Sequence, residues 1–393
     1  MNGCDFGQTC DVELMIPYGR QNISDDDIAA VVDVLRSEWL TQGPGIASFE
    51  QAVAAACQAQ HAVAVSNATA ALHIACLALD VGPGDLVWTS PNTFVASANC
   101  ARYCGADVDF VDIDPQTLNI SVERLAEKLA AARLVGRLPK VVIPVHFSGR
   151  SCDMRAIGQL AREYGFRVIE DASHAVGASH EGVPVGACQY SDITVFSFHP
   201  VKIITTGEGG MLLSNDTALA KRLVRLRTHG IAQGSDELVS FPQGPWEYQQ
   251  IELGFNYRMT NLQAALGQSQ LARLPQFIAR RRELVRQYHE LLAELPIVLP
   301  QPSEESAWHL YPIRVPAERR LEVFSRLRAA DVWVQVHYIP VHTQPYYRNL
   351  GFKPGDFPEA ERYFAEAFSL PLFYDLTDAE QRCVADLLRE ALS

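Results

Sequence analysis

From residue 61 to about residue 229, short apolar segments alternate with segments whose apolar residues have helical spacing. The apolar segments are hydrophobic almost throughout, as in residues 61–66 (HAVAVS) and 140–146 (KVVIPVH). Strands of this kind are buried on both faces, because a strand with one solvated face would alternate polar and apolar residues. The alternation with helices therefore predicts an α/β fold with a mostly parallel sheet covered on both sides.

The order of the expected elements indicates where a ligand would bind. The expected strands are residues 61–66, 86–89, 107–113, 140–146, 167–171, 192–198 and 210–213, and the expected helices are 68–79, 96–104, 121–132, 154–164 and one that ends near residue 228. In open sheets of this class, ligands bind beyond the carboxyl ends of the strands. Residues that directly follow a strand are therefore the first candidates for chemistry.

The pattern changes after about residue 230, which predicts a second, smaller domain. Residues 231–250 are polar and contain Gly, Pro and Gln, which is typical of a long loop. Residues 261–288 predict a long helix with one break at Pro275, and short strands at 311–315 and 332–336 then mix with helices. We expect a flexible leader over residues 1–14, a large cofactor-binding domain over 15–274 and a small C-terminal α/β domain over 275–393.

Charge and cysteine content exclude several classes of function. The formal net charge of -13 disfavours a general nucleic-acid surface or an anionic membrane as a partner. The nine cysteines form no Cys-x-x-Cys pair and no zinc-type spacing, so we expect reduced thiols and no metal. No apolar run approaches the ~20 residues that cross a bilayer. The start of the chain also lacks the order of a signal peptide, so a cytoplasmic protein is expected.

Lys202 is a candidate nucleophile in the link between two expected strands. It is flanked by apolar residues on both sides, and a glycine-rich tail follows at residues 207–210. Desolvation favours the neutral amine, which is the form that attacks a carbonyl to make an imine. A single lysine at such a place is more often an ordinary surface residue, so the prediction depends on its companions.

Asp171 ends the expected strand 167–171, where a carboxylate is costly unless it has a partner. A protonated pyridine nitrogen would be such a partner, and His174, three residues later, could form a hydrogen bond with a ring oxygen. A helix or turn cap is an equally good explanation of Asp171 when this strand is considered alone.

A possible anion site follows the expected strand 61–66. Ala68 and Thr69 begin a helix there, and helix N-termini bind phosphate through their N–H groups. Ser197, five residues before Lys202, is a second candidate phosphate ligand. Phe94 follows the strand 86–89 and could stack on a flat ring, although a core Phe is the more frequent explanation.

These four strand ends together favour one cofactor, pyridoxal 5′-phosphate (PLP). An anion site, a stacking ring, an acid and a lysine occur in chain order in one expected sheet. No Gly-x-Gly-x-x-Gly sequence follows a strand, which disfavours a dinucleotide, and no Walker-type loop is present.

The same residues lie in motifs that resemble those of the sugar aminotransferases of the DegT/DnrJ/EryC1/StrS family. The resemblance extends from about Ile16 to the C-terminus. It is carried by residues 40–44 (LTQGP), 66–72 (SNATAAL), 170–174 (EDASH), 197–202 (SFHPVK), 254–259 (GFNYRM) and 334–338 (VQVHY). The resemblance implies the PLP-dependent transferase fold of type I, the fold of aspartate aminotransferase.

The resemblance also implies a role for each matching residue. Lys202 would be the imine lysine, Asp171 the partner of the pyridine nitrogen and His174 the neighbour of the ring oxygen. Ala68, Thr69 and Ser197 would bind the phosphate, and Phe94 would cover the ring. Many relatives carry Gln at the position of His174, and relatives that dehydrate sugars carry His at the position of Lys202, so the lysine here favours transamination.

Further positions are implied to act between subunits and at the substrate. Asn256 would reach the phosphate of the other subunit's cofactor, which implies a homodimer with shared active sites. The implied contacts to a sugar nucleotide are Thr41, Arg258, His337 and Tyr338.

Within the family, residues 198–210, 309–313 and 335–338 are most similar to members that act in pseudaminic acid biosynthesis. This implies transamination at C4 of a UDP-linked 4-keto-6-deoxy-N-acetylhexosamine, with glutamate as donor and pyridoxamine phosphate as the aminated form of the cofactor. Three alternatives stay open. They are a sister aminotransferase for a 4-amino-arabinose or perosamine precursor, a PLP-binding regulator without turnover, and a binding protein without a cofactor.

Overall fold

A seven-stranded sheet forms the centre of the molecule. The computed structural model describes residues 15–232, 238–239, 244 and 246–393, so the leader predicted for residues 1–14 lies outside the described residues. The strand order is β2-β10-β9-β6-β5-β3-β4. The strands are β2 (His61–Val65), β3 (Leu86–Thr89), β4 (Asp107–Phe110), β5 (Val141–Ile143), β6 (Arg167–Asp171), β9 (Ile193–Ser197) and β10 (Gly210–Ser214).

The predicted mostly parallel sheet is confirmed, with one exception in its direction. Strand β10 pairs antiparallel with both β2 and β9, whereas the pairs from β9 to β4 are parallel. Because β9 and β10 are antiparallel neighbours, residues 198–209 join them without a crossover helix. That link carries Lys202.

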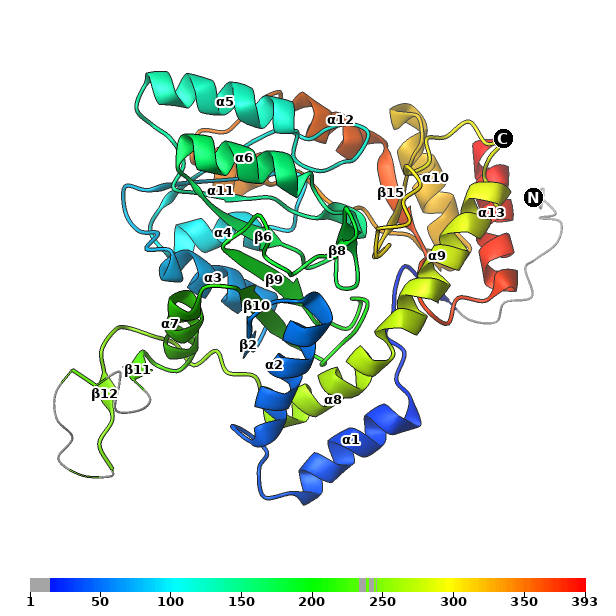
Figure 1. Cartoon of the computed structure of the whole chain (residues 1–393). Helices are drawn as coiled ribbons and strands as arrows, with labels where there is room; N and C mark the ends of the chain where they lie inside the picture. Colours follow the sequence, from blue (N-terminus) through cyan, green and yellow to red (C-terminus); the bar gives the residue numbers. More distant parts are fainter. Residues whose placement is uncertain (1–14, 233–237, 240–243, 245) are drawn as a thin grey trace.

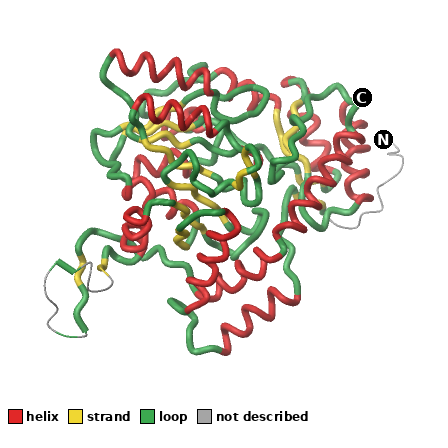
Figure 2. The backbone as a smooth tube through the Cα atoms, viewed as in Figure 1, coloured by secondary structure: helices red, strands yellow, loops and turns green. Residues whose placement is uncertain are grey.

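Helices cover both faces of the sheet, as Figures 1 and 2 show. In β6, Val168 packs into the buried cluster that contains α5 and α6, and Ile169 packs into the cluster on the other face. Successive side chains of a strand point to opposite faces, so both must be apolar here. The helices that follow the strands are α3 (Ala68–Ala78), α4 (Ala96–Tyr103), α5 (Val122–Leu134), α6 (Met154–Tyr164) and α7 (Thr217–Arg227).

Helices that precede the central sheet in the sequence pack against a helix that follows it. Helix α8 (Asn261–Ala272) packs against α1 (Asp25–Arg36) and α2 (Pro44–Cys57), as Figure 1 shows. The long helix predicted for residues 261–288 is two helices, because α8 ends before Arg273 and α9 (Leu274–Leu291) begins with Pro275 in its first turn. Proline suits a first turn because it has no N–H to donate.

A second buried cluster lies at the C-terminal side of the molecule. It is built mainly from α9, α10 (Ala317–Ala329) and α13 (Asp378–Leu392), with β13 (Tyr311–Arg314) paired to β15 (Ala367–Leu370). Strand β1 (Ile16–Pro17) joins it by pairing with β14 (Val332–Trp333). We propose that this cluster is the core of a small domain that begins near residue 275, although residues 341–367 pack partly into the first cluster.

The remaining elements are short. They are β7 (Ser179–His180), β8 (Val183–Pro184), β11 (Ile231–Ala232), β12 (Gln249–Gln250), α11 (Pro345–Arg348), α12 (Pro358–Glu366) and 3-10 turns at Phe147–Gly149 and Val341–Thr343. The polar stretch predicted as a loop thus begins and ends in a paired β11–β12. The strand predicted for 332–336 is shorter, because pairing to β1 stops after Trp333.

Most of the described cysteines are free, as expected, and are buried or half-buried. The expectation of reduced thiols is wrong at Cys383, which is in a disulfide. In the described part of the chain, no helix combines the length and the apolar character needed to cross a membrane.

Candidate active site

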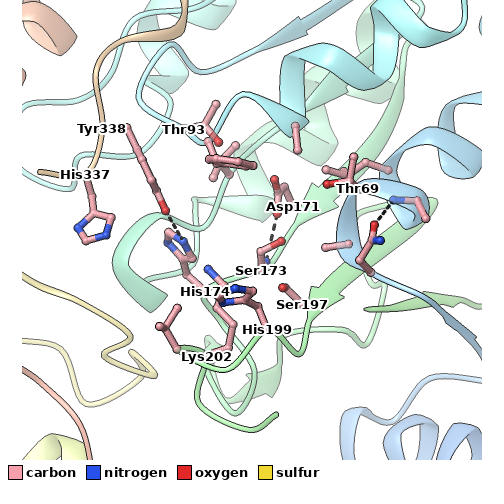
Figure 3. A pocket seen from close by; sticks show the side chains of 18 of the residues that line it. Thr69, Thr93, Asp171, Ser173, His174, Ser197, His199, Lys202, His337 and Tyr338 are labelled. Carbon is pink, nitrogen blue, oxygen red and sulfur yellow. Dashed lines mark hydrogen bonds between the residues drawn. The ribbon is translucent and has the colours of Figure 1, made fainter. Parts of the chain in front are cut away.

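A pocket of about 920 Å³ opens at the carboxyl ends of the central strands. Its walls come from the start of α3, the loop before α4, the end of β6, the β9–β10 link and residues 335–338 (Figure 3). The structure brings together nine of the residues singled out from the sequence: Ala68, Thr69, Phe94, Asp171, His174, Ser197, Lys202, His337 and Tyr338.

Lys202 projects into this pocket from the β9–β10 link. Its backbone N–H donates to the carbonyl of His199 at 2.9 Å, which closes a tight turn around it. Burial lowers the pKa of Lys202 to about 8, and the nearby charge of Asp171 opposes this shift. An amine with this pKa has a neutral, nucleophilic fraction at physiological pH.

Asp171 is held by its backbone on both sides. Its N–H donates to the carbonyl of Pro144 at 2.9 Å, and its carbonyl accepts from the N–H of His146 at 3.0 Å. Its Oδ1 accepts from the N–H of Ser173 at 3.1 Å. The carboxylate is therefore fixed at the end of β6, 5 % exposed and facing the pocket.

His174 has a defined tautomer. Its Nδ1 accepts a hydrogen bond from the N–H of Ser148 at 3.3 Å, so its proton is on Nε2, which lies 3.1 Å from the hydroxyl of Tyr338. Burial, with the charge of Lys202, lowers the pKa of His174 well below its usual range. This imidazole is thus a neutral hydrogen-bonding group that does not titrate near pH 7.

His309 is a residue that the sequence reasoning did not assign to the site. Its Nε2 lies 3.4 Å from the Nζ of Lys202, and its buried Nδ1 has no partner among the described residues. Arg281 fixes the segment by donating to the carbonyls of Trp308 and His309. Burial and the charge of Lys202 lower the pKa of His309 well below its usual range.

The expected substrate residues divide into two groups. His337 and Tyr338 line the pocket, and burial lowers the pKa of His337 to about 3. Thr41, Arg258 and the phosphate candidate Asn256 are not among the lining residues of this chain's pocket. Their predicted roles stay predictions.

The start of α3 has free donors for an anion. Asn67 caps the helix, with its side chain accepting from the N–H of Ala70. The N–H groups of Ala68 and Thr69 have no acceptor within the described ranges of the chain. At Gly210 of the adjacent β10, an added Cβ would lie 2.8 Å from the backbone nitrogen of Ala68, so only glycine permits this approach.

The residues of this pocket fit PLP. Two free helix N–H groups and the hydroxyl of Ser197 suit its phosphate, and the exposed ring of Phe94 suits its flat ring. A buried carboxylate suits a pyridine nitrogen, and a lysine with a lowered pKa suits its aldehyde. Each group is of the chemical kind that the cofactor requires.

The comparisons with known proteins agree with this chemistry. The family model described as the DegT/DnrJ/EryC1/StrS aminotransferase family matches residues 21–389. The spore coat polysaccharide biosynthesis protein SpsC of Bacillus subtilis is 39 % identical over 384 residues, which is 95 % of this chain and 96 % of that protein.

Two solved structures are similar over nearly their whole length. Helicobacter pylori PseC, an aminotransferase involved in the biosynthesis of pseudoaminic acid, has a TM-score of 0.89 at 27 % identity and covers 96 % of this chain and 99 % of its own. The PMP form of the putative sugar aminotransferase Spr1654 of Streptococcus pneumoniae has a TM-score of 0.87 at 30 % identity, covering 96 % and 98 %. Spr1654 has also been solved in a PLP form.

Proposed function

Because the chain belongs to the DegT/DnrJ/EryC1/StrS aminotransferase family, we propose that it aminates C4 of a UDP-linked 4-keto-6-deoxy-N-acetylhexosamine, with glutamate as donor. At the coarser level, it is a PLP-dependent sugar aminotransferase with the type I fold. The observation that carries the proposed chemistry is the half-buried Lys202, whose amine has a lowered pKa and shares one pocket with the fixed carboxylate of Asp171.

Each lining residue has a proposed task in holding the cofactor. Lys202 would hold it covalently, Asp171 would face the ring nitrogen and Phe94 would cover the ring. The phosphate would be held by Ala68 and Thr69 and by the hydroxyl of Ser197. When bound, PLP supplies an electron sink for the charge left when a proton leaves the donor's α-carbon.

The proton transfers would fall to the Nζ of Lys202. In the first half of the cycle, the neutral amine accepts a proton from the α-carbon of the donor. The resulting ammonium would pass this proton to C4′ of the cofactor, and in the second half Nζ would take a proton from C4′ and deliver it to C4 of the sugar. His309, 3.4 Å from Nζ, is placed to orient the amine between these two transfers.

His174 and Tyr338 would complete the wall near the ring oxygen. The Nε2–H of His174 donates to the hydroxyl of Tyr338, which leaves the tyrosine proton free to donate into the pocket. Burial raises the pKa of Tyr338 above its usual range, so this hydroxyl stays protonated and acts as a donor.

The proposed assembly is a homodimer with shared active sites. Asn256 is exposed and lies outside the pocket of its own chain, which supports the prediction that it serves a second subunit's phosphate. Arg258, two residues later, is proposed to meet the substrate in the same way. Sedimentation of the wild type would test whether the homodimer forms. Sedimentation of Asn256→Asp would test whether the homodimer persists when the proposed contact to the phosphate is removed.

A second candidate is a sister aminotransferase that acts on another nucleotide-linked keto-sugar. It is favoured by the relative SpsC, which is more similar in sequence than PseC and is described by a role in spore coat polysaccharide biosynthesis. Sugar specificity lies in loops around the pocket, and Lys202 and Asp171 serve both reactions.

The test is to incubate the enzyme with glutamate and a panel of UDP- and dTDP-linked 4-keto sugars, and to identify the products by NMR. The proposal expects a 4-amino product from the UDP-linked 4-keto-6-deoxy-N-acetylhexosamine and none with Lys202→Ala. Amination of a dTDP sugar alone would support the second candidate. No amination of any sugar, in a sample that binds PLP, would refute both.

A further inference from the structure

The carboxylate of Asp171 has a second donor that neither the sequence motifs nor the proposed roles assign. The hydroxyl of Ser97 donates to Oδ2 of Asp171 at 2.6 Å. The N–H of Ser173 donates to Oδ1, and Figure 3 shows Ser173 beside Asp171. Each oxygen of the carboxylate is therefore held by a different donor. Ser97 lies in the first turn of α4, 74 residues away in the sequence, so this contact depends on the packing of α4 against the sheet.

The hydroxyl of Ser97 is itself in contact with a third side chain, Thr93. The hydroxyl oxygens of Thr93 and Ser97 are 2.8 Å apart, and both side chains are almost fully buried. An ionised carboxylate only accepts hydrogen bonds, so the proton of Ser97 is committed to Asp171. The oxygen of Ser97 must then accept from Thr93. The three side chains form a chain of donation in one direction, in which each bond strengthens the next.

Thr93 also belongs to the loop that presents Phe94. Both residues line the pocket, and Ser97 follows one turn later with its N–H donating to the carbonyl of Phe94 at 3.3 Å. One short segment thus supports both the carboxylate that would face the ring nitrogen and the aromatic side chain that would cover the ring face. A displacement of this segment would move both groups together.

We propose that Ser97, supported by Thr93, is a positioning residue that fixes the direction in which the Asp171 carboxylate faces the cofactor. The terminal torsion of an aspartate is broad, so a carboxylate held at one oxygen alone can turn. Donors at both oxygens remove that freedom and leave the remaining lone pairs for a ring N–H. This inference rests on the proposed PLP chemistry, which it deepens.

The test compares variants that remove a hydroxyl with variants that keep it. Ser97→Ala removes the donor, and Thr93→Val removes only its support while keeping the shape of the side chain. Thr93→Ser keeps the hydroxyl, so this variant should behave as the wild type does. Thr89→Val is the matched control, because Thr89 is equally buried on β3 and its hydroxyl donates to the carbonyl of Ile143 instead.

Three quantities are measured: the dissociation constant of PLP, the visible circular dichroism of the bound cofactor, and kcat and KM for the keto-sugar. A hydrogen bond to a charged group contributes about 1.5 kcal/mol or more, which corresponds to about a tenfold change in an equilibrium constant. Ser97→Ala should therefore raise the dissociation constant of PLP roughly tenfold. The visible dichroism should fall and kcat should drop roughly tenfold, with KM unchanged. Thr93→Val should move the same quantities less, and Thr89→Val should leave them as in the wild type.

Unchanged dichroism and PLP affinity in both Ser97→Ala and Thr93→Val would overturn the inference. If Ser97→Ala does not fold, as judged by thermal unfolding of the apoenzyme, the comparison of Thr93→Val with Thr93→Ser decides. A failure of the proposed function would be seen separately, because the wild type itself would then bind no PLP or aminate no sugar.

Discussion

The lowered pKa of Lys202 gives a quantitative prediction for the apoenzyme. An ordinary lysine has a pKa near 10.4, whereas burial lowers the pKa of Lys202 to about 8. At pH 8, about half of this amine is then neutral, and at pH 7 about one tenth is neutral. An ordinary lysine at pH 7 would be neutral in well under one molecule in a thousand.

The assay is an NMR titration of apoenzyme labelled with 13C at the lysine Cε. The chain contains only five lysines, so the spectrum is simple, and the signal of Lys202 is the one that Lys202→Arg removes. The expected midpoint is near pH 8. Asp171→Asn removes a negative charge that favours the ammonium form, so its midpoint should be lower than in the wild type.

The titration can contradict the reasoning in two ways. A wild-type midpoint above pH 10 would mean that water reaches the amine freely and that burial does not tune it. A midpoint that does not fall in Asp171→Asn would mean that the charge of this carboxylate does not act on the amine. Thermal unfolding of Lys202→Arg serves as the control. A melting temperature like that of the wild type would mean that the missing 13C signal reflects the loss of this lysine and not the loss of the fold.

Three further outcomes are expected. Lys202→Ala should show no turnover, with partial recovery on addition of a small amine, and normal turnover without amine would contradict the assignment. Burial alone would raise the pKa of Glu170, but hydrogen bonds from His146, Ser191 and Thr194 lower it overall. The ionised carboxylate therefore stabilises the fold at pH values above the pKa that Glu170 has in the unfolded chain. This stabilisation is lost as the pH falls through the pKa of the folded state. Glu170→Ala should therefore lower the free energy of unfolding by about 3–5 kcal/mol in denaturant titrations at pH 7 and by less below about pH 4. Gly210→Ala should raise the PLP dissociation constant about tenfold in apoenzyme titrations, because its Cβ would crowd the start of α3, whereas Gly82→Ala, with open space around it, should not.

Much of the pocket could be predicted because its parts are local features of single strands. Asp171 ends a strand, Ala68 begins a helix and Lys202 lies in a short link, and each can be recognised within a few residues of sequence. A parallel sheet then brings strand ends to one edge, so their meeting follows from the fold class. The alternation of apolar strands and helices predicted that class, and the sheet confirms it.

The residues that the sequence reasoning missed reach the pocket through packing. Ser97 is a buried helical serine, and His309 reaches Lys202 from 107 residues away. No local pattern distinguishes such residues from ordinary core positions. The strand predicted for 332–336 was too long and β15 was not predicted, because β14 and β15 are defined by partners far away in the chain and not by their own composition.

The tautomer of His174 has a consequence for how this position can vary. A neutral imidazole that accepts at Nδ1 and donates at Nε2 offers one acceptor and one donor. The amide of glutamine offers the same pair without a charge. The two side chains therefore have the same hydrogen-bonding capacity at this site. An exchange of His174 for glutamine would therefore leave the charge around Lys202 unchanged and alter mainly the shape of the side chain.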